Sequence, residues 1–245
     1  MRASMTTPKV LARAAGVLYL LLAGAAFNEG YVLPRIVKSG DAAATAGNIR
    51  ASATLFRVGF VGDMVAATCW LLLAMALYLL LNHVHQLAAA AMVTFAAVGA
   101  AIQYLNQLNQ YTALTIATGD HYTRAFGGAG SDGLTLLFAT MQHSGYLIDS
   151  MFFGLWLLPL GYLVIKSGYF PKPLGVLLIV GCIAYIASLF TRVLAPAVGS
   201  STAPLFIAIG GTAELCFLAW LLIKAVNAPV PGRQASAIAR PGSSR

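Results

Sequence analysis

Seven ionisable side chains lie within or at the ends of long apolar segments of this sequence, where charged groups are rare. They are four acids, two arginines and one histidine: Glu29, Arg57, Asp63, His143, Asp149, Arg192 and Glu214. A charge at the centre of a bilayer costs about 2.5 to 3.5 kcal/mol on insertion scales, so such groups normally face a partner or a water-filled cavity. If all were ionised and close together, the acids would outnumber the arginines, and protons or a cationic ligand would compensate the excess.

Polar stripes on two of the apolar segments extend this candidate site. At about 100° per residue, four amides of the third segment share one helix face, namely Gln103, Asn106, Gln107 and Gln110. One face of the fourth segment carries Gln142, His143, Tyr146 and Asp149. We expect the two stripes to face each other where their segments leave the membrane, with Glu214 deeper as the floor of the site. The expected ligand-binding set is Glu29, Arg57, Asp63, Gln103, Asn106, Gln107, Gln142, His143, Tyr146, Asp149, Arg192 and Glu214.

This set predicts an outward-facing polar pocket that binds or moves a small cationic or amphiphilic ligand, and other interpretations fit the same residues. An intramembrane enzyme could pair His143 with Asp149 or Glu214 as acid and base, although no nucleophile elbow, zinc motif or phosphate loop is present in the sequence. An accessory or sensory subunit would need only packing faces, and the polar groups would then merely fix the helices together. Against transport, the sequence shows no internal repeat of the kind that builds many transporters.

The amino-acid composition indicates that the segments carrying these polar side chains lie in lipid rather than in water. The chain is 59% hydrophobic and 9% charged, with mean hydropathy +0.80, whereas roughly 25% of residues are charged in an average soluble domain. The formal net charge is +8, but the basic residues form no stripe or patch of the kind that binds nucleic acid. We therefore expect no nucleic-acid partner and expect membrane lipids as the partner. Cys69, Cys182 and Cys216 lack metal-ligand spacing, so we predict small core residues, no metal site and no cofactor.

The hydropathy pattern predicts an all-α membrane protein, a six-helix transmembrane bundle. Each predicted span reaches the roughly 20 residues that cross a bilayer: 11–29, 55–81, 87–117, 134–165, 174–194 and 203–226. Five glycines in 118–133 predict a loop at the tip of the hairpin between the third and fourth spans. Residues 1–226 thus form the transmembrane domain, and 227–245 are expected to be a disordered basic tail. The first span could instead be a cleaved signal peptide, but we expect it to be retained.

The distribution of Lys and Arg predicts that both termini are cytoplasmic. Nine basic residues then lie on the inner side and six on the outer side. The sequence also predicts structure in the segments between the spans. Asp41 is at the N-cap position of a short helix that runs toward Arg57. Gly168 suits a left-handed helix end after Lys166, and two prolines delay the fifth span to about Leu174.

Several motifs resemble one family of membrane proteins across residues 10–226. They are Gly40-Asp41-Ala42-Ala43-Ala44-Thr45, Leu55-Phe56-Arg57, Ala125-Phe126-Gly127, Phe152-Phe153-Gly154-Leu155-Trp156-Leu157-Leu158-Pro159-Leu160-Gly161-Tyr162, Lys166-Ser167-Gly168-Tyr169-Phe170-Pro171 and Leu174-Gly175. The chain is thereby similar to the bacterial multi-pass membrane family known as domain of unknown function 4386. The resemblance implies six spans and the bacterial inner membrane, and it implies no activity, cofactor or site.

Overall fold

The computed structural model describes residues 8–226, and these residues confirm the all-helical, six-span prediction. The helices are α1 (Pro8–Phe27), η1 (Asn28–Val32), α2 (Leu33–Ile36), α3 (Ala42–Ala51), α4 (Ala53–Leu81), α5 (Gln86–Thr118), α6 (Asp120–Leu155), α7 (Leu157–Ser167), α8 (Lys172–Leu194) and α9 (Pro196–Ile223). Six helical segments are long and apolar enough to cross a membrane. The chain is therefore a multi-pass membrane protein. The tail predicted for 227–245 lies outside the described residues.

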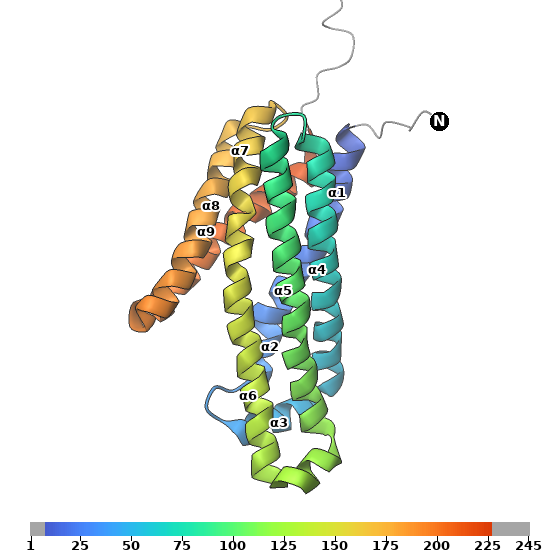
Figure 1. The fold of residues 1–245 in the computed structure, drawn as a ribbon, viewed down its shortest axis with the longest axis vertical. Coiled ribbons are helices and arrows are strands. Elements are labelled where there is room, and N and C mark those ends of the chain that lie inside the picture. The colour runs from blue at the N-terminus through green and yellow to red at the C-terminus, as the bar shows by residue number, and fades with distance from the viewer. Residues whose placement is uncertain (1–7, 227–245) are drawn as a thin grey trace, which may run out of the picture.

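The bundle is elongated, with short connections at one end and a more elaborate structure at the other (Figure 1). The start of α1, the α4–α5 turn, the α7–α8 turn and the end of α9 lie together at one end. The opposite end carries α3 and the α5–α6 hairpin, against which α3 packs. We call this second end the hairpin end. The α8–α9 hairpin leans away from α6 toward its own turn, so the two diverge there.

The tip of the α5–α6 hairpin corrects one prediction, because 118–133 is mostly helical and not a loop. Only Gly119 separates α5 from α6, and Gly127 interrupts α6 with φ 72° and ψ 166°. That conformation suits glycine, which lacks the Cβ that penalises positive φ. The glycines therefore supply one kink rather than an irregular segment, and the fourth span begins well before the predicted residue 134.

The first span also differs from its prediction, because it continues beyond Glu29 to Ile36. The chain passes through a π-helical turn, η1, between α1 and α2. Pro34 follows this turn; it has no backbone N–H to donate to the preceding turn, and its ring crowds that turn's carbonyl. A π-turn is one way a helix absorbs such an interruption, and such turns are frequent at functional sites. Glu29 thus lies inside a continuous helical segment and not at its end.

Glycines bring α7 and α8 into close contact near their turn. A Cβ at Gly161 would lie 2.7 Å from the Gly175 carbonyl oxygen, and one at Gly175 would lie 2.6 Å from that of Gly161. Gly168 ends α7 in the left-handed conformation, at φ 69°. The predicted start of the next span was slightly wrong, since α8 begins at Lys172 with Pro173 in its first turn, where a missing N–H is harmless. Likewise, α9 begins at Pro196 rather than at 203.

Two apolar clusters hold the bundle, and polar residues separate them. The larger cluster includes Trp70, Trp156 and Phe217, all completely buried. The smaller one lies toward the hairpin end, where Ile36, Ile49 and Phe56 bring α2, α3 and α4 together. Along α5, buried residues run from Ala100 in the first cluster, through the amide stripe, to Leu114 in the second. We call the intervening zone the polar layer.

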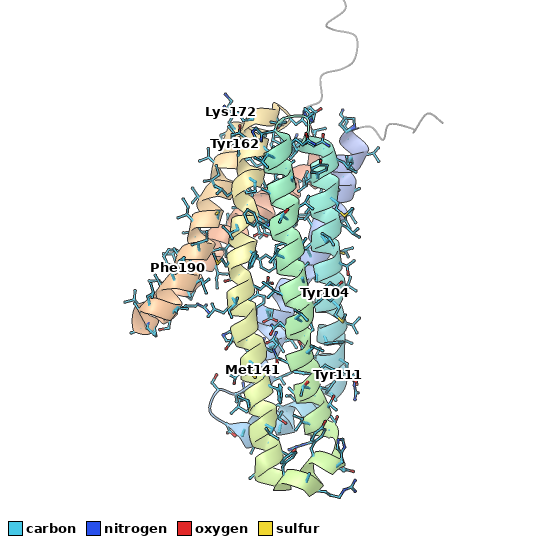
Figure 2. The ribbon with its side chains drawn as sticks, viewed as in Figure 1. Tyr104, Tyr111, Met141, Tyr162, Lys172 and Phe190 are labelled. Atoms are coloured by element: carbon cyan, nitrogen blue, oxygen red, sulfur yellow. The ribbon has the colours of Figure 1, made fainter. Side chains whose placement is uncertain are left out.

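Apolar side chains also cover much of the outer surface, as expected where lipid is the solvent. Figure 2 shows Tyr104, Tyr111 and Met141 on the outside of α5 and α6, and Phe190 on the α8–α9 hairpin. The Tyr104 hydroxyl turns back to hydrogen-bond Thr68 and the Met64 carbonyl, so that its polar atom is satisfied at an apolar face. Cys69 and Cys182 are buried as predicted, but Cys216 is exposed and is not a core residue.

Candidate functional site

Asp63 is the centre of the polar layer on the α4 side. The residue is 0% exposed, and its Oδ2 accepts hydrogen bonds from Asn28 Nδ2 at 2.7 Å and from Gln107 Nε2 at 3.2 Å. Asn28 belongs to η1, so the π-turn, α4 and α5 meet at this carboxylate. No Lys or Arg lies within ion-pair distance of Asp63 among residues 8–226.

The amide stripe of α5 divides between neighbours, which corrects the expectation that it faces α6 as a whole. Asn106 does face α6, donating Nδ2 to the Gln142 carbonyl oxygen at 2.8 Å. Gln107 and Gln110 turn instead toward α4, where Gln110 donates to the Phe56 carbonyl at 3.3 Å. A helix with a broad polar face contacts two partners, because each neighbour covers only part of its circumference.

A cavity of about 450 Å³ lies in the angle between α6 and the α8–α9 hairpin. The residues that line it come from six elements: Tyr19, Leu22, Ala23, Glu29, Gly30, Gln103, His143, Tyr146, Leu147, Ser150, Phe153, Tyr185, Ser188, Arg192, Ile207, Gly211, Glu214, Leu215 and Leu218. The divergence of the α8–α9 hairpin from α6 accounts for this space (Figure 1). Six of the predicted site residues therefore line one cavity: Glu29, Gln103, His143, Tyr146, Arg192 and Glu214.

Two carboxyl groups reach the cavity from different walls. Glu29, on η1, accepts a hydrogen bond from Gln142 Nε2 at 2.6 Å, which ties the π-turn to α6. Glu214, on α9, interacts electrostatically with Tyr19 and Tyr185. Neither carboxylate has a basic partner within ion-pair distance in the described part of the chain.

Aromatic rings form much of the remaining wall. Tyr19 packs edge-on against Trp156 with ring centroids 5.8 Å apart, and Phe153 stacks on Trp70 at 4.2 Å. These contacts anchor the rings in the larger apolar cluster. Tyr146 lies within electrostatic range of all four acids: Glu29, Asp63, Asp149 and Glu214.

Polar atoms on the cavity wall lack partners. Gln103 Oε1, on a side chain 5% exposed, makes no hydrogen bond. Arg192 Nε is likewise buried and unpaired. Buried polar atoms in native proteins nearly always have a protein, water or ligand partner. The cavity therefore offers both donors and acceptors to an occupant.

Asp149 and Arg57 do not lie where the sequence placed them. Asp149 is 1% exposed with both carboxyl oxygens unpaired, yet it does not line the cavity. Arg57 is exposed and outside the cavity, because the first turns of α4 direct it away from the bundle. It is therefore not one of the counter-charges. Arg192 lines the cavity but pairs with none of the acids that the structure describes.

The acid–base pair that an enzyme would need is not formed within 8–226. His143 is exposed at the cavity and has no hydrogen bond to Asp149 or Glu214. In the same range, no three His, Cys, Asp or Glu side chains gather as a metal-binding group. His85 has a structural role, since its Nδ1 accepts from Ala88 N and caps α5.

Sequence reasoning missed three residues of the site, namely Asn28, Tyr19 and Tyr185. Asn28 stands next to Glu29 in an apolar segment, and this adjacency of two polar residues was a usable signal. The two tyrosines lie in the middle of their spans rather than at the ends, where tyrosine normally anchors a helix in the interface. A tyrosine at that depth needs a polar neighbour, and Glu214 provides it for both.

Comparison with known proteins gives one match. Residues 14–225 match the family described as "Domain of unknown function (DUF4386)". No curated protein and no solved structure matches the chain. The matched range spans α1 to the end of α9 and contains every residue of the candidate site.

Proposed function

The chain belongs to this family, and we propose that it binds and moves a small amphiphile with an organic-cation head group, in the bacterial cytoplasmic membrane. The observation that carries this proposal is the cavity of about 450 Å³ that Glu29 of η1 and Glu214 of α9 both line. A volume in the range of roughly 300 to 1,000 Å³ is typical of small-molecule sites. The positive-inside distribution of Lys and Arg supports cytoplasmic termini, which puts the hairpin end and the cavity's diverging side outward.

The chemistry of the wall favours a cationic head group. Two carboxylates without basic partners attract positive charge. The aromatic side chains of Tyr19, Tyr146, Phe153 and Tyr185 line the cavity, and a ring face that contacts a cation contributes about 0.5 to 2 kcal/mol depending on desolvation. An organic ammonium group suits this wall better than a metal ion, which would require several converging oxygen, nitrogen or sulfur ligands.

The rest of the wall favours an apolar tail. Leu22, Leu147, Ile207, Leu215 and Leu218 line the cavity beside the polar groups. Because the α8–α9 hairpin diverges from α6, an amphiphile could enter sideways from lipid with its tail still in the hydrocarbon region (Figure 1). This arrangement supports ligand binding over acid–base chemistry, since His143 has no carboxylate partner.

The proposal is tested with three probes that share a ten-carbon tail: decyltrimethylammonium, decanol and decanoate. Binding to the purified full-length protein in non-ionic detergent is measured by calorimetry. We expect the ammonium probe to bind at least about tenfold more tightly than the other two, a difference of about 1.4 kcal/mol. Equal affinity for all three would remove the cationic specificity and contradict the proposal.

Variants locate the bound probe. Glu29→Gln and Glu214→Gln should each weaken decyltrimethylammonium binding, while Asp120→Asn, an exposed acid at the start of α6, should not. Gly211 lines the cavity and has no atom within 4 Å of a Cβ built there, so Gly211→Leu should fill the cavity without disturbing the fold. Unchanged binding in a folded Gly211→Leu protein would place the probe elsewhere.

A further inference from the structure

A second group of unpaired atoms surrounds Asp63, away from the cavity. Asp63 Oδ1, Asn28 Oδ1 and Gln107 Oε1 are all buried and without hydrogen-bond partners. Their side chains are 0%, 6% and 3% exposed. These three residues are joined to one another, since both amide nitrogens donate to Asp63 Oδ2. Each side chain of this cluster, which we call the Asp63 triad, thus keeps one free oxygen.

The hydrogen bonds decide which amide atom is the oxygen. An ionised carboxylate only accepts hydrogen bonds, so the atom of each amide nearest to Asp63 must be the NH₂ group. Rotating either amide would place oxygen against oxygen at 2.7 or 3.2 Å. The free atoms are therefore acceptors on all three residues, and they call for an occupant that is electron-poor.

The local charge agrees with a cationic occupant. Asp63 has no basic partner among the described residues, and its charge acts on another acid, Glu29. A buried carboxylate without a counter-charge is strongly unfavourable, so it is normally paired, bound to a metal or protonated. Hard cations such as Na⁺, Mg²⁺ and Ca²⁺ prefer carboxylate and amide oxygens, whereas the triad offers no imidazole or thiolate for a transition metal.

A small cavity is lined by two members of the triad, Asp63 and Asn28, and gives the ion room; Gln107 does not line it. It has a volume of about 180 Å³ and is lined by Gly24, Asn28, Val32, Leu55, Val58, Gly59, Gly62 and Asp63. Gly59 is necessary for this geometry, because a Cβ there would overlap the Asn28 amide. The π-turn η1 presents Asn28 to this small cavity and the next residue, Glu29, to the large one. The two sites are thus separate.

We infer that the Asp63 triad binds a small monovalent cation, with Na⁺ as the probe, through Asp63 Oδ1 and Asn28 Oδ1, while Gln107 holds the carboxylate in place. A single carboxylate matches a single positive charge, whereas the divalent ions normally recruit more carboxylates or several retained waters. These two oxygens come from η1 and α4, and Gln107 of α5 bonds to Asp63, so the bound ion would also stabilise the contact between these elements. This site uses other ligand residues than the organic-cation site proposed above.

The test is equilibrium binding of ²²Na⁺ to the purified full-length protein, with choline chloride holding the ionic strength constant. We expect saturable binding of one ion per chain. Asp63→Asn and Gln107→Leu should weaken the affinity by about 10- to 100-fold, the usual loss when a residue that supports a metal site is changed. Gln110→Leu is the matched control, since Gln110 is also a buried amide of α5 with an unpaired oxygen, but it bonds to the Phe56 carbonyl and not to Asp63.

Each possible outcome either supports or contradicts Na⁺ binding at the Asp63 triad. Absence of saturable Na⁺ binding to the wild-type protein would overturn it, and water or a proton would then occupy the triad. Binding that survives Asp63→Asn but is lost in Glu214→Gln would place the ion in the large cavity and would equally overturn it. If Asp63→Asn does not yield folded protein, Asn28→Ala and Gln107→Leu carry the test, and unchanged affinity in both contradicts the inference.

Discussion

Asn106 of α5 occupies the space that a side chain at Gly145 of α6 would need. From this position its Nδ2 donates to the Gln142 carbonyl oxygen at 2.8 Å, and its Oδ1 accepts from Asn109 Nδ2 at 3.0 Å. A Cβ built at Gly145 overlaps the Asn106 amide. The two long helices are therefore fixed to each other within the polar layer by one amide fitted against one glycine.

Gly145→Ala should destabilise the protein. The added methyl group must displace the Asn106 amide or push α5 and α6 apart, and overpacking of this kind costs about 1 to 3 kcal/mol. We expect a lower midpoint of thermal unfolding in detergent. Gly133→Ala on the same helix is the control, because a Cβ at Gly133 meets nothing within 4 Å. That control should be neutral or gain up to about 1 kcal/mol from reduced backbone entropy. Equal effects of the two variants would contradict the fit of Asn106 against Gly145.

Arg192 and Asp149 should behave as independent residues. The charge count of the sequence predicts Arg192 as a counter-charge to Asp149 and Glu214, but in the described residues Arg192 pairs with no acid and Asp149 has no hydrogen-bond partner. The unfolding free energies of Arg192→Ala and Asp149→Asn should therefore add in the double variant, within about 0.5 kcal/mol. A double-mutant cycle in detergent measures this sum. A larger coupling energy would restore the charge pair that the sequence predicts.

Asp41→Ala should weaken α3 selectively. Asp41 caps this helix by accepting a hydrogen bond from Ala44 N at 2.8 Å, and loss of such a cap costs about 1 kcal/mol. Hydrogen exchange of the α3 amides should accelerate correspondingly, while exchange in α7 stays unchanged. Ser52→Ala is the control, since Ser52 precedes α4 without making a side-chain cap. The cap would be unimportant if both variants left α3 exchange unaltered.

Reporter fusions should place both ends of the described chain in the cytoplasm. Alkaline phosphatase, which is active only outside the cytoplasm, should be inactive when fused after Val226. The same enzyme inserted at Gly128, near the α5–α6 tip, should be active, because that tip lies at the opposite end of the bundle (Figure 1). The reverse pattern would invert the topology and turn the diverging side of the cavity toward the cytoplasm.

The sequence by itself determined the class of fold and the identity of many polar residues. Hydropathy predicts six spans because lipid requires about 20 apolar residues per crossing, and this rule does not depend on how the helices are arranged. Local signals were equally reliable where the physics is local. Asp41 caps the helix that it precedes, and Gly168 takes the left-handed conformation after α7, because both effects involve only a few neighbouring residues.

The glycines at the hairpin tip show where local signals fail. Their number predicts a loop, yet Gly128, Gly130 and Gly133 lie in helix. At the hairpin tip, tertiary packing outweighs the low helix propensity of glycine. Helix α3 packs on α5 and α6, and Arg50 bonds to Asp132 at 3.1 Å. Among the glycines inside α6 only Gly127 has a non-helical conformation, while Gly119 is the extended residue between α5 and α6.

Only the tertiary structure decided which neighbouring helix or cavity each polar side chain of α5 contacts. Periodicity puts Gln103, Asn106, Gln107 and Gln110 on one face, but it cannot say which helix covers which part of that face. In the structure Gln107 donates to Asp63, Asn106 donates to the Gln142 carbonyl of α6, and Gln103 lines the cavity. The charge count of the sequence predicts that Arg57 and Arg192 pair with the acids. An ion pair, however, requires that the two side chains point toward each other as well as lie at the same depth in the membrane. The order of the helices around the bundle determines where each side chain points. That order is a property of contacts between distant segments, and a single sequence does not contain it.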